Sequence, residues 1–322
     1  MTRIAINGVG KVGKALLEHL KERDGELAVV YLGRSQSVWF STEGTAVKEL
    51  PAAEDLTFRP VTSQERDEIL DQTDVDVWFE LTPTDLDEAE TVFRRILGLL
   101  ERGISVILAT KSPVLHDYMG LKTAAERNGA RLGLSAVMGA SLPSYALGHY
   151  GAMGSEIRSM AGILNGTSNF VLALMEAGNS FAEAIAQAVA TGIAEPNWSY
   201  DVDGLDSAIK MTILASVILD RNVRLDRDNV QGLRSIDPLQ FTACLDQGRR
   251  YKLVAEFRDG EVSVSPRQYQ VDDLFYHVNG ANKALRLDTT TLSDMTVIGG
   301  KSGLPEVAAS MYRDLCWMRE DR

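Results

Sequence analysis

The sequence is poor in cysteine, histidine and basic residues. Two cysteines and four histidines among 322 residues provide neither a disulfide framework nor the ligand spacing of a metal site. Acidic residues outnumber basic ones by 45 to 33, which argues against a nucleic acid or an anionic membrane as partner. No apolar run approaches the roughly 20 residues that cross a bilayer. We therefore expect a cytoplasmic protein that binds neither nucleic acid nor membrane.

The first 140 residues alternate between strand-like and helix-like segments. Helices are expected at about 14–23, from an N-cap at Thr84 to Gly103, and in a segment that ends at Gly129. Strands that alternate with helices predict an α/β fold with a Rossmann-like, doubly wound parallel sheet. The buried strands of this sheet are expected in five short apolar runs, at 3–7, 27–31, 75–80, 105–110 and 131–137.

The pattern changes after about residue 144. Helices are expected to dominate from 169 to 219, and Ser180 with Glu183 forms a capping box for one of them. Strand-like segments follow at 251–257 and 261–265, separated by a turn at Asp259 and Gly260. A last helical segment covers about 305–317. The second part of the chain therefore predicts an α+β domain.

A glycine-rich turn follows the first expected strand. Its pattern, GxGxxG, is weak alone, but here it lies between a strand and a helix, where it binds dinucleotides. Gly8 makes the tight turn, Gly10 lets the backbone approach a pyrophosphate, and Gly13 lets helix and strand pack closely. The alternative is a structural turn without a ligand. The expected cofactor-binding residues of this turn are Gly8, Gly10, Lys11, Val12 and Gly13.

The end of the second strand bears on the choice of cofactor. A preference for NAD usually shows as an Asp or Glu at this point, whereas this strand ends in Gly33, Arg34 and Ser35. Arg34, helped by Ser35, is placed to bind a 2′-phosphate. The sequence therefore favours NADP, with NAD as the alternative, unless Arg34 is a solvated loop residue.

A cluster of charges lies at the start of an apolar helix. Asp206 and Lys210 are four residues apart and share one helical face. The residues after them are almost all apolar, so the helix is expected to be buried and its charges need partners or a substrate. Glu195, Asp201 and Asp203 come shortly before. The cluster favours a small polar substrate with an ammonium group, and a surface ion pair is the alternative. Before it, in residues 164–170, Thr167 and Ser168 are candidate N-caps.

At these residues the sequence resembles homoserine dehydrogenase, in the short form without a C-terminal regulatory domain. The resemblance spans nearly the whole chain, and the block around residues 192–210 is its most specific part. The matching segments are GVGKVG at 8–13, GILNGTSNFVL at 162–172, GIAEP to DVDGLDSAIK at 192–210, and a degraded closing turn and helix at 298–315.

The resemblance implies the reversible NAD(P)H-dependent reduction of L-aspartate 4-semialdehyde to L-homoserine, a step of threonine and methionine biosynthesis. It implies a proton-transferring Lys210 beside Asp206, and a Lys111 that faces nicotinamide and substrate. Either lysine is a candidate to stabilise the negative charge on the reacting oxygen and to donate the proton. Residues implied to hold or orient the substrate are Glu195, Asp201, Asp206 and Thr167, and those implied to flank the nicotinamide are Thr82 and Pro83.

The resemblance also implies a domain organisation and further ligands. A dinucleotide-binding domain is expected at 1–143, a substrate and dimerisation domain at 144–302, and a C-terminal helix at 303–322 that returns to the first domain. The protein is expected to form a homodimer. A monovalent cation is implied on backbone carbonyls near Ser135, Met138 and Ala140.

The sequence departs from the family pattern at four places. Thr110 replaces an asparagine, and Pro196-Asn197-Trp198 replaces an Asp-Pro pair. Ser135 and Ser141 replace a glutamate and a glycine near the expected cation. Two alternatives therefore stay open. One is a related dehydrogenase of another small amino- or hydroxy-aldehyde, and the other is a non-catalytic, NADP(H)-binding regulatory protein.

Overall fold

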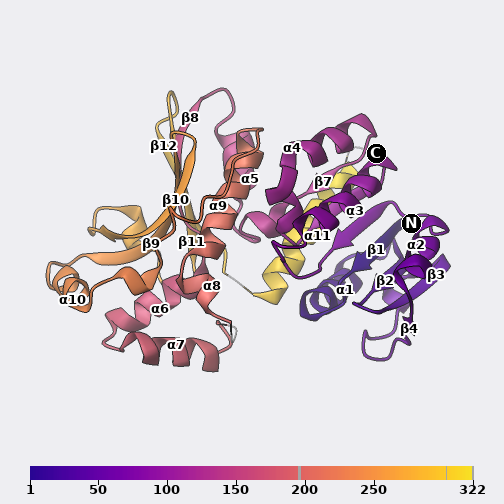
Figure 1. Ribbon diagram of the computed structural model, residues 1–322, viewed down its shortest axis with the longest axis horizontal. Helices are drawn as coiled ribbons and strands as arrows, with labels where there is room; N and C mark the ends of the chain where they lie inside the picture. The colour runs from indigo at the N-terminus through magenta and orange to yellow at the C-terminus, as the bar shows by residue number, and fades with distance from the viewer. Residues whose placement is uncertain (195–196, 302, 321–322) are drawn as a thin grey trace. The chain divides into compact units, whose positions relative to one another are not determined.

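The computed structural model describes residues 1–194, 197–301 and 303–320. The chain divides into two compact units (Figure 1). The first unit joins Met1–Val137 to Leu304–Arg322, and the second unit is Met138–Gly303.

The first unit is built on a seven-stranded sheet in the order β4-β3-β2-β1-β5-β6-β7. The chain leaves β1 towards β2 on one side and returns to β5 on the other, so a topological switch point lies at the carboxyl end of β1. The parallel Rossmann-like sheet that the sequence predicts is confirmed. Its parallel strands are β1 (Thr2–Asn7), β2 (Leu27–Gly33), β5 (Val77–Glu80), β6 (Ser105–Leu108) and β7 (Leu132–Gly133).

Two strands that were not predicted from the sequence extend this sheet with antiparallel pairing. They are β3 (Ser37–Ala46) and β4 (Arg59–Pro60). Only one of the ten residues of β3, Val38, is buried, so the strand lacks the continuous apolar run of a buried parallel strand. The strand expected at 131–137 is wrong in length, because the chain turns into a 3-10 helix at Ser135–Met138.

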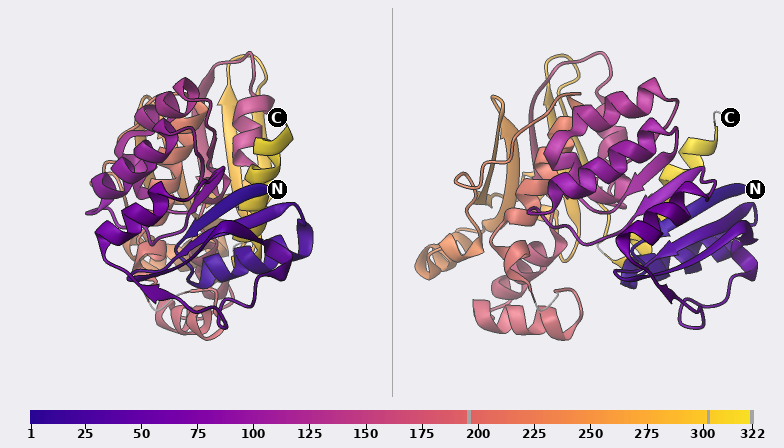
Figure 2. Two further views of the ribbon diagram at one scale, coloured as in Figure 1. Left: turned by 90° about the vertical axis from the view of Figure 1, so that its right-hand side faces the viewer. Right: turned by 45° about the vertical axis from the view of Figure 1, so that its right-hand side comes forward.

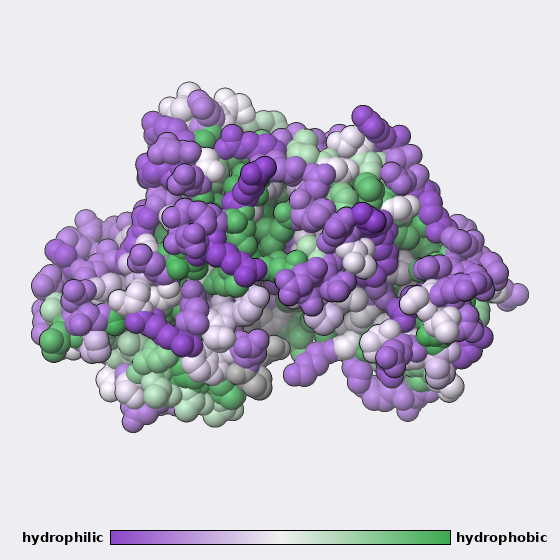
Figure 3. Space-filling model, in the orientation of Figure 1, coloured by the Kyte–Doolittle hydropathy of each residue, from purple (hydrophilic) through white to green (hydrophobic). Residues whose placement is uncertain are grey.

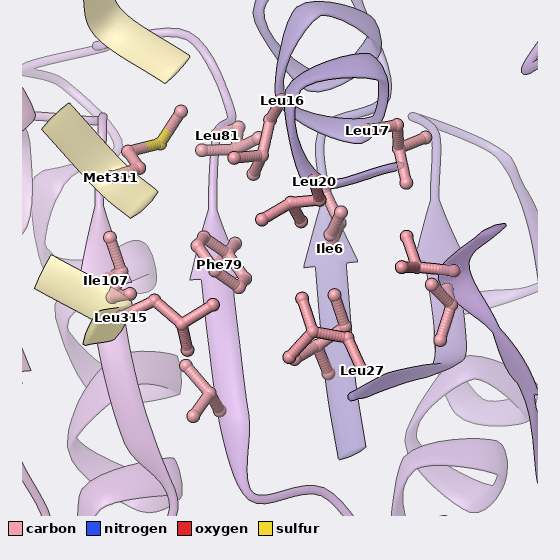
Figure 4. Packing of buried hydrophobic residues seen from close by; sticks show 14 of the residues in the cluster. Ile6, Leu16, Leu17, Leu20, Leu27, Phe79, Leu81, Ile107, Met311 and Leu315 are labelled. Carbon is pink, nitrogen blue, oxygen red and sulfur yellow. The ribbon is translucent and has the colours of Figure 1, made fainter. Parts of the chain in front are cut away.

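Helices cover both faces of this sheet (Figures 1 and 2). Helices α1 (Lys11–Arg23) and α11 (Leu304–Glu320) pack on one face. Helix α3 (Ala89–Glu101) lies against the other face, with α4 (Ser112–Arg127) beside it and α2 (Ser63–Asp71) nearby. In Figure 4, leucines of α1 and the α11 residues Met311 and Leu315 point at Ile6, Phe79 and Ile107 of the sheet.

One predicted helix start is wrong. Thr84 does not cap α3, which begins five residues later at Ala89 with Glu88 at its N-cap. The Thr84 hydroxyl instead accepts a hydrogen bond from the backbone N–H of Lys111, at 3.1 Å. Thr84 therefore ties the segment after β5 to the segment after β6.

The second unit contains a five-stranded antiparallel sheet in the order β10-β9-β8-β11-β12. The predicted hairpin is confirmed, with Asp259 (φ 53°) and Gly260 (φ 92°) in its turn. The strands are β8 (Ile157–Ile163), β9 (Arg250–Arg258), β10 (Glu261–Tyr269), β11 (Lys283–Thr289) and β12 (Asp294–Gly299).

Helices α6 and α9 of the second unit pack against this sheet. The capping box of Ser180 and Glu183 is confirmed at the start of α7. The helices of this unit are α5 (Ser144–Ala146), α6 (Gly166–Glu176), α7 (Phe181–Ala190), α8 (Ser199–Val202), α9 (Leu205–Ile218) and α10 (Pro238–Asp246).

Hydrophilic residues are spread over both units on the face drawn in Figure 3, between smaller apolar patches. Within the described part of the chain, no helix combines the length and the apolar character needed to span a membrane.

A buried carboxyl attaches helix α11 to the end of β7. Asp314 accepts hydrogen bonds from the Ser135 hydroxyl at 2.5 Å and from the Ser135 N–H at 2.8 Å. Burial nevertheless raises the pKa of Asp314 to about 6, above its ordinary value of 3.8. The native state therefore holds the Asp314 proton more tightly than the unfolded chain does, and this contribution to stability is lost as the pH rises through about 6.

We expect Asp314→Asn to remove this pH dependence. Between pH 4.5 and 7.5, the free energy of unfolding of the wild type should fall by roughly 2 kcal/mol relative to that of the variant. Urea unfolding across this pH range measures the difference. Asp71→Asn, which alters an exposed carboxyl, is the control and should follow the wild type. Parallel curves for wild type and Asp314→Asn would contradict the assignment.

Candidate functional site

The glycine turn lies at the switch point of the first unit. Gly8 has a φ of +107°, and a Cβ there would be 2.6 Å from the Leu81 carbonyl, so this position requires glycine. A Cβ on Gly13 would be 2.6 Å from the Gly8 oxygen. Around Gly10, in contrast, nothing lies within 4 Å of an added Cβ. Two glycines thus allow close packing, and the third leaves open space.

This open space suits a pyrophosphate. Helix α1 begins at Lys11, directly after Gly10, and the first N–H groups of a helix are donors without intrahelical partners. The turn is held by the Gly33 carbonyl, which accepts from the N–H groups of Gly8 and Val9 at 2.9 Å each. The residues that the sequence analysis assigned to this turn therefore fit a dinucleotide.

The segment after β2 is fixed by two arginines. The Arg34 guanidinium lies 3.7 Å from the centre of the Phe58 ring and donates to the Ala53 carbonyl at 3.1 Å. Arg66 donates to the carbonyls of Arg34 and Ser35, at 2.8 and 3.0 Å. Beside this segment is a hollow of about 750 Å³, a volume in the range of small-molecule sites. The residues that line this hollow come from strand β1, the segment after β2, helix α2, strand β5 and helix α3. They include Asn7, Ser35, Ser63, Arg66, Trp78 and Arg95.

A buried glutamate at the end of β5 was missed by the sequence analysis. Glu80 is fully buried and accepts from the Asn7 amide at 3.0 Å, the Trp78 indole at 3.0 Å and the Thr82 hydroxyl at 2.6 Å. Arg95 of α3 forms an ion pair with it at 3.2 Å. The sequence does place an acid directly after the apolar residues Val77–Phe79. Because a buried charge needs partners, this position could have been predicted as a polar site. Glu80 fixes Thr82 at the edge of the sheet.

Thr82, Pro83 and Lys111 all follow the carboxyl ends of neighbouring parallel strands. Thr82 and Pro83 come directly after β5, and Lys111 is the N-cap of α4 after β6. The Lys111 side chain is partly buried. These three residues therefore lie at the same edge of the sheet as the glycine turn.

The second unit brings Asp201, Asp206 and Lys210 together. The Lys210 ammonium lies 2.6 Å from Asp206 Oδ2 and donates to the Leu164 carbonyl at 3.1 Å. Only 15% of each of these two side chains is exposed. The alternative of a surface ion pair is therefore wrong.

Asn165, which the sequence analysis did not single out, joins the two carboxylates. Its Nδ2 donates to Asp201 Oδ1 at 2.6 Å and to Asp206 Oδ2 at 2.8 Å. Its Oδ1 accepts from the Ser168 N–H at 2.9 Å, so Asn165 is the N-cap of α6, and the expectation of Thr167 or Ser168 is wrong. Because Asn165 Oδ1 is used for the helix cap, the NH₂ group on the other side of the amide faces Asp201 and Asp206. The known preference of Asn for N-caps was the available signal.

Burial and the neighbouring Asp206 charge raise the pKa of Asp201, against the hydrogen bond from Asn165. A carboxylate whose charged form is disfavoured by burial and by a neighbouring negative charge is stabilised by an added cation, such as a substrate ammonium. Thr167 is buried close by, and its hydroxyl donates to the Ile193 carbonyl at 3.1 Å. Glu195 lies outside the described residues.

In the turn where a cation was predicted, two backbone carbonyls accept hydrogen bonds from protein side chains. The Met138 carbonyl accepts from the Ser144 hydroxyl at 2.5 Å, and the Gly139 carbonyl accepts from the Lys283 ammonium at 2.6 Å. Ser135 is engaged with Asp314 in the first unit. Among the described residues there is also no cluster of His, Cys, Asp and Glu that could hold a metal ion.

A Rossmann-type turn in one unit and a partly buried lysine with two carboxylates in the other are typical of two-unit NAD(P)-dependent oxidoreductases. The sequence model of homoserine dehydrogenase matches residues 143–316. The chain belongs to the homoserine dehydrogenase family.

Individual relatives agree with this assignment. The chain is 28% identical to homoserine dehydrogenase of Methanocaldococcus jannaschii over 326 residues, which cover 97% of each protein. It is 27% identical to the NAD(+)-dependent homoserine dehydrogenase of Pseudomonas canavaninivorans, covering 97% of this chain and 95% of the relative. The crystal structure of a putative homoserine dehydrogenase from Archaeoglobus fulgidus matches with a TM-score of 0.84 and 29% identity, covering 98% of each chain.

Proposed function

We propose that the protein catalyses the reversible reduction of L-aspartate 4-semialdehyde to L-homoserine with NAD(P)H. The observation that carries this proposal is the cluster of Lys210, Asp206, Asp201 and Asn165, which combines a proton donor with anions suited to an amino group. A bound NAD(P)H supplies the hydride. The protein supplies orientation, charge and the proton.

Lys210 stabilises the negative charge that develops on the aldehyde oxygen and donates the proton that completes the alcohol. Asp206 orients it through their 2.6 Å contact. The Leu164 carbonyl, at 3.1 Å, limits its rotation further. In the oxidative direction Lys210 accepts the proton of the hydroxyl group.

The substrate amino group is bound by Asp201 and Glu195, with Thr167 as a further substrate contact. Support for Asp201 comes from its burial and its proximity to Asp206, which together make an added cation favourable. In the first unit, Thr82 and Pro83 flank the nicotinamide, and Lys111 faces both nicotinamide and substrate.

The cofactor is NADP, with NAD as the weaker ligand. Arg34 and Ser35 bind the 2′-phosphate. The end of β2 carries no Asp or Glu that would repel this phosphate. The hollow beside Ser35 and Arg66 receives the adenosine. Support for NAD comes from the relative whose name gives NAD(+) dependence.

The remaining assignments rest on the family resemblance. Residues 144–302 bind substrate and form a homodimer, and the chain works in threonine and methionine biosynthesis. The cytoplasmic location stays a prediction.

The oxidation of NADPH and NADH by purified protein with L-aspartate 4-semialdehyde tests the proposed function. We expect turnover with both, and a kcat/KM at least about tenfold higher with NADPH because of the charge-assisted contacts of Arg34. Succinate semialdehyde, which lacks the amino group, is the matched control. It should react at least about 100-fold more slowly, because it leaves Asp201 without its cation.

The same assay separates the alternatives. Turnover only with another small aldehyde would support the related dehydrogenase. The reason to consider this alternative is the altered loop containing Asn197 and Trp198, which could change the shape of the substrate pocket. Tight NADPH binding without turnover of any aldehyde would support the regulatory protein. Either result would contradict the proposal.

A further inference from the structure

A buried lysine occupies the turn in which the family resemblance implies a metal ion. The turn is residues 138–142, where Gly139 (φ 110°) and Ala140 (φ 56°) both take left-handed backbone conformations. The Gly139 carbonyl accepts from the Leu142 N–H at 3.2 Å and from Lys283 Nζ at 2.6 Å. The ammonium group thus lies on a carbonyl of the predicted cation site.

Lys283 reaches this turn from the sheet of the second unit. It is the first residue of β11, is paired with Gly299 of β12, and is only 2% exposed. A lysine is almost never buried to this extent unless its charge has partners. The Gly139 oxygen provides such a partner, which explains why the charge is tolerated here.

The turn at residues 138–142 packs closely against the end of β12. A Cβ on Gly300 (φ +65°) would lie 2.6 Å from the Leu142 nitrogen, so only glycine allows this approach. The Ser141 hydroxyl donates to the Lys301 carbonyl at 3.0 Å. Ser141, one of the departures from the family pattern, therefore helps to hold the turn beside β11 and β12.

The residues present do not fit a monovalent metal ion. An ion on the Gly139 carbonyl would share its oxygen with the Lys283 ammonium and would be repelled by it at short range. The Met138 carbonyl already accepts from the Ser144 hydroxyl at 2.5 Å. The family's glutamate at position 135 is replaced by a serine, which removes a negative charge that a cation would favour.

We propose that the Lys283 ammonium is a built-in replacement for the monovalent cation, so that folding and turnover need neither Na⁺ nor K⁺. The part of this proposal that concerns turnover rests on the proposed function. The part that concerns the fold does not, because it depends only on contacts within the second unit.

The melting temperature of the cofactor-free protein in NaCl, KCl or choline chloride at equal ionic strength tests the proposal. A site that binds an ion stabilises the folded state in a saturable manner. We expect the wild-type melting temperature to agree within about 1 °C among the three salts, since the ammonium already fills the site. A saturable rise with Na⁺ or K⁺ over choline would overturn the proposal, whether or not the protein turns over the aldehyde.

Lys283→Ala provides the complementary test. This change frees the Gly139 carbonyl and leaves space, so Na⁺, K⁺ or NH₄⁺ should raise the melting temperature of the variant by about 3 °C over choline. Lys252→Ala is the matched control, because Lys252 is also fully buried and donates to the Val278 carbonyl at 2.8 Å. It should be destabilised without any rescue by cations.

Two outcomes of the variant experiment matter. A folded Lys283→Ala protein that responds to no cation, or that responds no more than Lys252→Ala, would overturn the proposal. If Lys283→Ala does not fold, the wild-type comparison decides. In the aldehyde assay, wild-type kcat/KM should agree within about twofold among the three salts, whereas absence of turnover in every salt would count against the proposed function alone.

Discussion

Lys210→Ala is expected to lower kcat for aldehyde reduction by about 10³-fold, which is the contribution of a positioned proton donor. The variant should bind NADPH with a dissociation constant within about twofold of the wild type, because Lys210 belongs to the second unit and the glycine turn to the first. Steady-state kinetics and a fluorescence titration with NADPH measure the two quantities.

Lys122→Ala is the matched control for this experiment. Lys122 forms an i,i+4 ion pair with Glu126 at 3.0 Å, the same spacing as Lys210 and Asp206, but on α4 at the surface. Its loss should leave kcat unchanged. Near-full turnover of Lys210→Ala would contradict its role, and if Lys111→Ala then lost activity, the proton donor would be Lys111.

Gly10→Ala is expected to abolish most dinucleotide binding without loss of stability. The added Cβ meets nothing within 4 Å in the protein, so the variant should fold with an unchanged melting temperature. The same methyl group occupies the space where a pyrophosphate approaches the backbone. We expect the dissociation constant of NADPH to rise by about 30-fold or more, as measured by fluorescence titration.

Gly8→Ala should show the opposite behaviour. Its Cβ would lie 2.6 Å from the Leu81 carbonyl, at a φ of +107°, and we expect a loss of about 3 kcal/mol or more in stability from strain and overpacking. The contrast between neighbouring glycines separates packing from binding. A Gly10→Ala protein that binds NADPH like the wild type would show that this turn holds no dinucleotide.

The parallel sheet could be predicted because its strands are buried on both faces and read as continuous apolar runs. Strand β2, buried along its whole length, is the clearest example. Strand β3 could not be predicted in the same way, because it lies on the antiparallel side of the sheet and only one of its ten residues is buried. Its pairing with β2 depends on the sheet that is already formed.

The pair of Asp206 and Lys210 could be predicted because helical spacing alone brings i and i+4 together. Asn165 could not, because its amide joins acids that are 36 and 41 residues further along the chain. Lys283 was beyond reach for the same reason, since it contacts Gly139 across 144 residues. Glu80 gave a local signal, but its partners Asn7 and Arg95 come from separate elements.

A crystal structure with NADP⁺ and L-homoserine tests the central claim most directly. We predict Lys210 Nζ at about 3 Å from the substrate hydroxyl, the substrate amino group on Asp201, and the pyrophosphate over Gly10. A complex in which the dinucleotide is bound at this turn but Lys210 points away from the nicotinamide, with protein between them, would contradict the account.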